Sequence, residues 1–219
     1  MRILVTAGPT REYLDDVRFL SNASSGKMGY AIATEAARRG HEAVLVSGPV
    51  ELPAPQGVEF VPVMTGREML DACLKYFESC GAAVMGAAVC DYRPAARTLG
   101  KPPKITEAYS VTLEPTEDIC AALGRLKEHR MVVGFALEQT AQAQAHAETK
   151  LRQKHCDAIV LNHPAGIGRD DTTVEVFVLG EGWSAPRTGP KTDLAAYLVD
   201  VLELLAAKAA EDHRGESAS

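Results

Sequence analysis

The segment RILVTAG, residues 2–8, begins the pattern that decides the fold. A short apolar run that stops at a glycine is typical of a buried parallel strand. A helix is expected from Lys27 to Arg39, with Gly40 as its carboxyl-terminal cap. The apolar run EAVLVSG (42–48) predicts a second strand. Residues 1–48 therefore form a strand–loop–helix–strand unit, in which residues 9–25 are the loop.

The rest of the chain repeats this alternation of apolar strands and amphipathic helices. Further strands are expected at 58–63, 82–89, 108–114, 131–137, 157–162 and 172–180. Helices are expected from residue 65 onward and at 116–128, 140–154 and 191–210. The order predicts a single Rossmann-like α/β domain over residues 1–210, with a doubly wound, mostly parallel sheet. Residues 211–219 are polar and are predicted to be a disordered tail.

Composition narrows the class of protein. The chain has 219 residues and a net charge of -6, which disfavours nucleic acid as a partner. Five scattered cysteines without a Cys-x-x-Cys pair indicate a reduced, cytoplasmic protein. No apolar run approaches the roughly 18 residues that span a membrane. The apolar run at the amino terminus is too short for a signal peptide. A small-molecule partner is favoured.

The stretch NASSGKMG, residues 22–29, has the features of a phosphate site at a helix amino terminus. It is neither a Walker loop nor the Gly-x-Gly-x-x-Gly dinucleotide fingerprint. The alternative is an ordinary serine cap with glycines for packing. A nicotinamide enzyme would need an acid after the second strand, where this chain has Ser47. An NAD(P)-dependent reductase therefore stays only as the runner-up.

Two basic stretches are candidates for binding phosphate. The loop CDYRPAARTLGKPPK (90–104) carries Arg93, Arg97, Lys101 and Lys104, and could cradle a polyphosphate or simply be a solvated loop. Asp91, directly after a predicted strand, could accept from a ribose hydroxyl, assist Mg²⁺, or cap the turn. Lys150 and Lys154 share one helix face, which is usually a surface face.

The remaining motifs exclude several kinds of chemistry. There is no Ser-His-Asp spacing, no His-x-x-x-His and no cluster of histidine and cysteine. Metal catalysis through protein ligands is therefore not expected. A nucleotide-dependent reaction in a cleft at the carboxyl ends of the strands is the prediction that the residue chemistry supports.

The stretch TAGPTREYLDDVRFLSNASSGKMG (6–29) closely resembles the opening signature of phosphopantothenoylcysteine synthetase. This ligase forms the synthetase domain of bacterial bifunctional proteins of coenzyme A biosynthesis. The resemblance continues through LVSGPV, AAVCDYRP, LEPTEDI, VGFALE, KLRQKHCDAIVLN and GPKTDLAAYLVDVL. It implies that 4'-phosphopantothenate attacks the α-phosphate of CTP, with ATP as the alternative and Mg²⁺ as the cofactor. Cysteine then attacks the acyl-cytidylate, and the by-products are CMP and pyrophosphate.

The resemblance also implies the residues of the site. Asn22 matches the catalytic asparagine, and Lys101 the essential lysine. The matches for nucleotide binding are Gly8, Ser24, Ser25, Gly26, Met85, Gly86, Ala87, Asp91, Lys101, Glu117, Asp118, Ile119, Cys120, Phe135, Lys150 and Lys154. The matches for binding of the acid substrate are Arg18, Asn22 and Ala88.

The chain departs from the family pattern at three places. The lysine motif, commonly Lys-Ile-Lys-Lys, reads KPPK over 101–104, which leaves either Lys101 or Lys104 as the key lysine. Gln139 replaces a frequent threonine, and Cys90 a usual alanine. The family dimerises, so a homodimer is expected. Because the chain starts at the synthetase's first strand, we expect the decarboxylase that acts next to be a separate protein.

Overall fold

The computed structural model describes residues 1–216, and residues 217–219 lie outside the described part. Within it, a nine-stranded sheet has the order β12-β11-β10-β9-β6-β1-β4-β5, with β13 paired to β11. The parallel strands are β1 (Arg2–Ala7), β4 (Glu42–Ser47), β5 (Val58–Pro62), β6 (Ala82–Met85), β9 (Met131–Leu137) and β10 (Ala158–Asn162). The antiparallel strands are β11 (Asp171–Val178), β12 (Gly182–Trp183) and β13 (Arg187–Pro190). This parallel core has the strand order of dinucleotide-binding folds.

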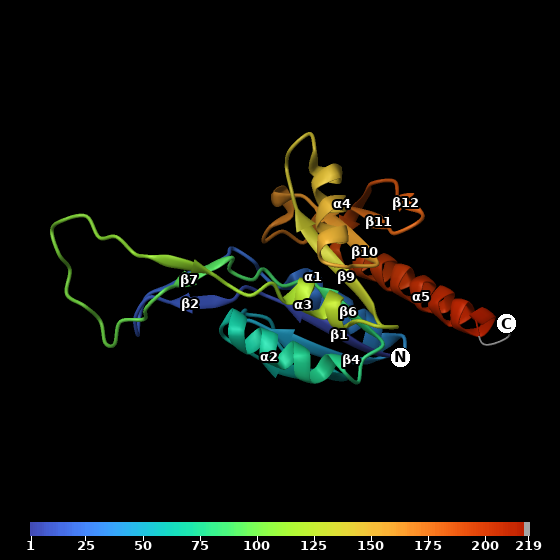
Figure 1. Ribbon diagram of the computed structural model, residues 1–219, viewed down its shortest axis with the longest axis horizontal. Coiled ribbons are helices and arrows are strands. Elements are labelled where there is room, and N and C mark those ends of the chain that lie inside the picture. The colour runs from blue at the N-terminus through green and yellow to red at the C-terminus, as the bar shows by residue number, and fades with distance from the viewer. Residues whose placement is uncertain (217–219) are drawn as a thin grey trace.

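Helices cover both faces of the sheet (Figure 1). Helices α1 (Lys27–Arg38) and α5 (Lys191–Glu216) pack on one face, and α2 (Gly66–Phe77), α3 (Ile119–Leu126) and α4 (Ala143–Gln153) on the other. Strand β1 shows why both faces are apolar: Ile3 and Val5 belong to the α1–α5 core, whereas Leu4 belongs to the opposite core. The predicted doubly wound α/β fold is confirmed.

Gly29 brings the start of α1 onto the end of β1. A Cβ atom on Gly29 would lie 2.6 Å from Ala7 Cβ and 2.9 Å from the carbonyl oxygen of Thr6. Only glycine allows this approach, because any side chain would collide with the strand. The predicted cap Gly40 has a φ of 84°, as a left-handed helix end requires. The first glycine-rich stretch is thus positioned at the carboxyl edge of the sheet.

Several predicted element boundaries were wrong. Residues 9–25 are not all loop, because β2 (Arg11–Tyr13) and β3 (Phe19–Ser21) pair in a hairpin. The strand expected at 82–89 ends at Met85. The strand expected at 108–114 forms only as β8 (Leu113–Pro115), which pairs with β7 (Tyr92–Pro94). Its other residues are exposed, so their alternation has no sheet face to cover.

The β7–β8 pair and the connection between its strands extend away from the sheet, at the left of Figure 1. At the other end of the chain, α5 continues to Glu216, beyond the end expected at residue 210. The last three residues of the tail predicted at 211–219 lie outside the described residues. None of the helices in the described part of the chain has the length and hydropathy of a membrane span.

Candidate active site

A cavity of about 250 Å³ opens where the strand order reverses, between β1 and β6. In doubly wound folds this switch point is the usual ligand site. Thr6 of β1 and Met85 of β6 form its floor at the strand ends. The other lining residues come from the segment after β6 and from the start of α3: Ala87, Val89, Cys90, Asp91, Thr116, Glu117, Asp118, Ile119 and Cys120. Seven of the residues predicted for nucleotide binding are therefore brought together here: Met85, Ala87, Asp91, Glu117, Asp118, Ile119 and Cys120.

Three threonine hydroxyls hold the cavity wall in place. Thr6 Oγ1 accepts from the backbone N–H of Ala87 at 3.2 Å, and Thr10 Oγ1 from that of Cys90 at 2.9 Å. Thr116 Oγ1 donates to the Cys90 carbonyl oxygen at 2.5 Å. These bonds satisfy backbone groups of a segment that has left the sheet. Sequence reasoning missed all three threonines, because isolated hydroxyls carry no spacing signal.

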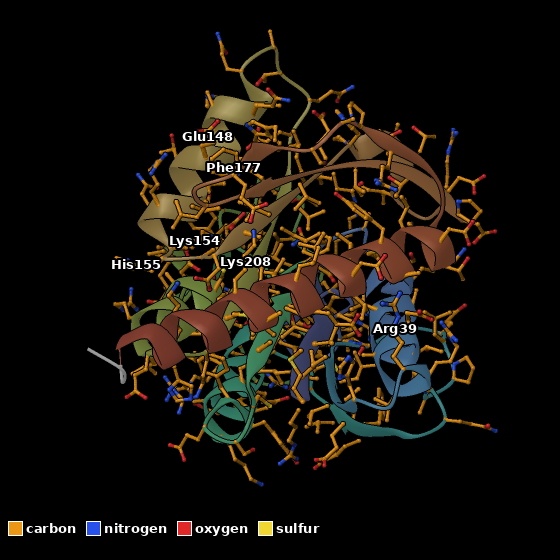
Figure 2. The ribbon with its side chains drawn as sticks, turned by 90° about the vertical axis from the view of Figure 1, so that its right-hand side faces the viewer. Arg39, Glu148, Lys154, His155, Phe177 and Lys208 are labelled. Atoms are coloured by element: carbon orange, nitrogen blue, oxygen red, sulfur yellow. The ribbon has the colours of Figure 1, made fainter. Side chains whose placement is uncertain are left out.

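Asp118 and Lys154 join the start of α3 to the end of α4, where Lys154 is labelled in Figure 2. Asp118 is the α3 cap and accepts from the backbone N–H of Ala121 at 2.9 Å. Lys154 Nζ lies 3.1 Å from Asp118 Oδ2. Partial burial lowers the pKa of Lys154, but Asp118 and the nearby cysteine sulfurs raise it, and the net pKa lies above its usual value. A fixed ammonium group therefore stands beside the cavity.

Lys150 does not join Lys154 at the cavity. Its Nζ donates to Glu138 Oε1 at 2.7 Å, although the two lysines are four residues apart. Lys154 is the carboxyl-terminal cap of α4, and its backbone N–H still donates to the Lys150 carbonyl oxygen at 2.9 Å, so the two residues stay one helical turn apart. Their side chains turn to different carboxylates, Lys150 to Glu138 and Lys154 to Asp118.

The glycine-rich stretch presents an open helix amino terminus. Gly26 caps α1 with a φ of 73° and makes no side-chain cap, so the alternative of an ordinary serine cap is wrong. Ser24 Oγ accepts from the Gly26 N–H at 3.3 Å. A Cβ atom on Gly26 would lie 3.4 Å from the backbone nitrogen of Gly8, which itself has a φ of 71°. Backbone N–H groups at the start of α1 are thus available to an anion.

Asn22 connects the glycine-rich stretch to the cavity wall. Its Nδ2 donates to the carbonyl oxygens of Ala88 at 3.1 Å and Val89 at 3.0 Å. The predicted substrate residues Asn22 and Ala88 are therefore in contact. Arg18 lies in the β2–β3 turn, where its Nε donates to the buried Asp15 at 2.6 Å. It does not line the cavity.

The basic loop does not form the phosphate cradle considered for it. Arg93 pairs with Glu114 at 2.8 Å and with Glu117 at 2.9 Å. Arg97 pairs with Asp16 at 2.8 Å. Because carboxylates of this chain neutralise both guanidinium groups, the exposed Lys101 and Lys104 are the cations that the loop can offer.

Lys101 follows an anchored glycine in the protruding loop. The Gly100 N–H donates to Asp16 Oδ2 at 2.8 Å, and the Asp16 N–H donates to the Gly100 carbonyl oxygen at 3.3 Å. Neither Lys101 nor Lys104 lines the cavity. A role for either lysine in catalysis requires the loop to approach the sheet.

Phe135 lies beside Gly86 but does not line the cavity. The ring is 4.0 Å from the position that a Gly86 Cβ atom would take, and it packs against the α1–α5 core. Ser25, Gly86 and Gly26 are likewise absent from the cavity wall. Among the described residues, no group of three or more His, Cys, Asp and Glu side chains could hold a metal ion.

The fold and the cavity define a class: doubly wound α/β proteins that bind a small polar ligand at the switch point of the sheet. The family model described as "DNA/pantothenate metabolism flavoprotein C-terminal domain" matches residues 1–205. The chain belongs to this family. The resemblance inferred from the sequence motifs is confirmed.

Relatives of known name agree with this family. The chain is 39% identical over 180 residues to the coenzyme A biosynthesis bifunctional protein CoaBC of Bacillus subtilis, covering 80% of this chain and 44% of the relative. It is 40% identical over 182 residues to a protein named cysteine/cysteine sulfinic acid decarboxylase from an unknown prokaryotic organism, covering 80% of this chain and 50% of the relative. The chain thus spans about half the length of the curated relatives that it matches.

Solved structures match almost the whole chain. The crystal structure of the C-terminal domain of CoaBC superposes with a TM-score of 0.79 at 36% identity, covering 94% of this chain and 96% of that one. A Cab2 mutant described as a complex with phosphopantothenate-cysteine superposes with a TM-score of 0.79, over 97% of this chain and 88% of that one. At 13% identity, the second match shows the shared fold alone.

Proposed function

We propose that this chain is a phosphopantothenate–cysteine ligase of coenzyme A biosynthesis that uses CTP and releases CMP and pyrophosphate. The observation that carries the proposal is the cavity at the β1–β6 switch point. Its wall contains seven of the residues that the family resemblance implies for the nucleotide, from Met85 to Cys120. Membership of the family and the relatives named CoaBC support the same activity.

In the first half-reaction, a carboxylate oxygen of phosphopantothenate attacks the α-phosphorus of CTP, and pyrophosphate leaves. The chain offers charge where the phosphates would lie: backbone N–H groups at the start of α1, and the Lys154 ammonium group beside the cavity. Asp91 lines the cavity, and a single carboxylate together with phosphate oxygens is a typical Mg²⁺ environment. When bound there, Mg²⁺ would neutralise part of the phosphate charge.

In the second half-reaction, the cysteine amine attacks the acyl carbon and CMP leaves. The sequence suggests that the Asn22 amide polarises the acyl oxygen by donating to it. The structure makes this role conditional, because Nδ2 already donates to Ala88 and Val89. Held in this way, Asn22 offers its Oδ1 as an acceptor for the attacking amine, and it can act as a donor only after exchanging one of these bonds.

The start of α3 supports CTP over ATP. Residues 116–120 make one wall of the cavity, where backbone groups can read a small pyrimidine base. In the free protein Lys154 pairs with Asp118, so a bound nucleotide would exchange one partner of this lysine for phosphate.

The test is incubation of the reduced protein with phosphopantothenate, cysteine, Mg²⁺ and either CTP or ATP, followed by mass analysis of products. We expect phosphopantothenoylcysteine with CMP and pyrophosphate, and faster turnover with CTP. Release of CDP would indicate acyl-phosphate chemistry and refute the mechanism. Equal or faster turnover with ATP would refute the nucleotide preference.

The runner-up, an NAD(P)-dependent reductase, is favoured only by the strand order. In the structure Ser47 ends β4, and its hydroxyl donates to the Gly48 carbonyl oxygen at 2.8 Å. No carboxylate stands at that position to hold a ribose. The comparisons with known proteins do not support this alternative. A change in NAD(P)H absorbance on adding a carbonyl substrate would support the reductase instead of the ligase.

We also propose that the protein is a homodimer and that a decarboxylase consumes its product. Apolar side chains on the protruding β2–β3 and β7–β8 segments support a contact between copies, since Val17, Tyr92, Leu99 and Tyr109 are exposed. Light scattering after size-exclusion chromatography tests the dimer. Addition of a phosphopantothenoylcysteine decarboxylase to the reaction tests the next step.

A further inference from the structure

Two cysteines from distant parts of the chain meet beside the cavity. Cys120 Sγ lies 3.4 Å from Cys156 Sγ, although 36 positions separate the residues. Cys120 is in the first turn of α3 and lines the cavity, whereas Cys156 is buried just before β10. The arrangement is a dithiol with one sulfur at the cavity wall and one behind it.

Gly134 of β9 makes room for both sulfur atoms. A Cβ atom at this position would lie 3.2 Å from Cys156 Sγ and 3.6 Å from Cys120 Sγ. Because glycine has no side chain, it leaves space for both sulfur atoms on this face of β9. Packing against β9 and against each other restricts movement of the two sulfur atoms away from one another.

Cys156 differs electrostatically from the other cysteines of the chain, including Cys120, whose pKa is raised by the hydrogen bond to Cys156 and by burial. Its hydrogen bond with Cys120 lowers the pKa of the Cys156 thiol below the usual value, against the effect of burial. Burial instead raises the pKa of Cys73 to about 12 and raises those of Cys80 and Cys90. Because the thiolate is the reactive form, oxidation should begin at Cys156, which has Cys120 in contact as its partner.

We propose that Cys120 and Cys156 form a peroxide-sensitive dithiol whose disulfide disables the neighbouring cavity; the effect on nucleotide rests on the function proposed above. One thiolate of the pair attacks a peroxide oxygen and expels hydroxide, which leaves a sulfenic acid. The sulfur of the second thiol then attacks the first sulfur and releases water. In total, two thiols lose two electrons and two protons, and one hydrogen peroxide becomes two waters.

Disulfide formation must move the cavity wall. The two sulfurs would approach from 3.4 Å to about 2.0 Å. Cys120 is two residues after Asp118, the α3 cap that also pairs with Lys154, and Cys156 is two residues after Lys154. The new bond would thus pull on both sides of the Asp118–Lys154 contact, where the base and phosphates of the nucleotide are proposed to bind.

The test is stepwise oxidation of the full chain with hydrogen peroxide, followed by alkylation and peptide mapping. We expect a peptide pair linked through Cys120 and Cys156 while Cys73, Cys80 and Cys90 remain alkylated as free thiols. CTP affinity, measured by calorimetry, should fall by about tenfold or more and recover with dithiothreitol. Hydrogen exchange in the first turn of α3 should rise in the oxidised chain, with or without nucleotide.

Two variants give the control. Cys156→Ser should form no disulfide and should keep its CTP affinity at the same dose of peroxide, whereas Cys80→Ser should respond like the natural chain. If Cys156→Ser does not fold, Cys156→Ala serves the same purpose. The proposal is wrong if the linked peptide is absent, if Cys156→Ser is equally sensitive, or if exchange in α3 does not change. Failure of the reduced chain to bind CTP would count against the proposed function alone, because peptide mapping and hydrogen exchange need no nucleotide.

Discussion

Lys154 Nζ lies 3.1 Å from Asp118 Oδ2, and this contact joins the end of α4 to the start of α3 beside the cavity. The two residues are far apart in the chain and belong to different βα units. Their pairing keeps a positive charge at the site before any phosphate arrives. Lys150, one helical turn earlier in α4, pairs instead with Glu138.

We predict that Lys154→Gln weakens CTP binding at least tenfold more than Lys150→Gln. Loss of a charge-assisted contact to phosphate costs about 1.5 to 3 kcal/mol. Lys154 pairs with Asp118, which lines the cavity, whereas Lys150 pairs with Glu138, which does not. Titration calorimetry of both variants measures the difference in CTP affinity. Lys150→Gln is the matched control, because it removes the same charge one helical turn away. Equal losses would mean that both lysines reach the triphosphate after a rearrangement of α4.

Asn22→Ala should impair the second half-reaction more than the first. One lost hydrogen-bonding group at the reacting acyl centre costs roughly 3 kcal/mol, about a hundredfold in rate. Single-turnover experiments should show pyrophosphate formation preserved and amide product reduced. Ser21→Ala is the control, because it removes a hydrogen bond to the Thr10 carbonyl oxygen next to the same loop. If both half-reactions fall equally, Asn22 only holds Ala88 and Val89 in place.

Lys101→Gln should remove at least tenfold more activity than Lys104→Gln. Lys101 follows Gly100, which Asp16 anchors, and the prolines at 102 and 103 restrict the backbone and keep the two lysines apart. Losing a charge-assisted contact to phosphate costs about 1.5 to 3 kcal/mol, which corresponds to a tenfold or larger loss of activity. Steady-state CMP release measures it. Greater damage from Lys104→Gln would move the essential position three residues along the loop.

Glu35→Gln should lower the melting temperature at neutral pH, and this difference should shrink in acid. Hydrogen bonds from Arg38 and Arg39 lower the pKa of Glu35 from its usual value of 4.5 to about 2. Because the pKa is lowered in the folded state, the stabilisation is fully present above pH 4.5 and is lost as the pH falls through about 2. Arg39, which faces α5 in Figure 2, also pairs with Asp200 at 2.6 Å.

The expected loss is about 1 kcal/mol, or roughly 2–4 °C for a domain of this size. Calorimetry of the natural chain and the variant between neutral pH and pH 2 measures it. Glu51→Gln, at an exposed position, should change the melting temperature little at any pH. A difference that persists unchanged in acid would show that the Glu35 side chain stabilises α1 by packing rather than by charge.

The sequence by itself determined the fold class and the family. Buried parallel strands are continuous apolar runs, so β1, β4, β9 and β10 were predicted within a residue or two of their observed bounds. Capping residues and glycines act within one turn of a helix, and they located α1 correctly. The stretch 6–29 was specific enough to indicate the family that the family model then matched.

Only the tertiary structure decided which side chains meet. The contacts of Asp118 with Lys154, Cys120 with Cys156, Asn22 with Ala88 and Asp16 with Gly100 all join segments that are distant in the chain. The short pairs β2–β3 and β7–β8 also need a partner strand rather than a local period. Periodicity and capping are local properties, whereas these contacts depend on the strand order and on how closely helices approach the sheet. That is why the sequence named most of the cavity wall but could not show that Lys150 pairs with Glu138, or that Arg93 and Arg97 pair with carboxylates of the chain.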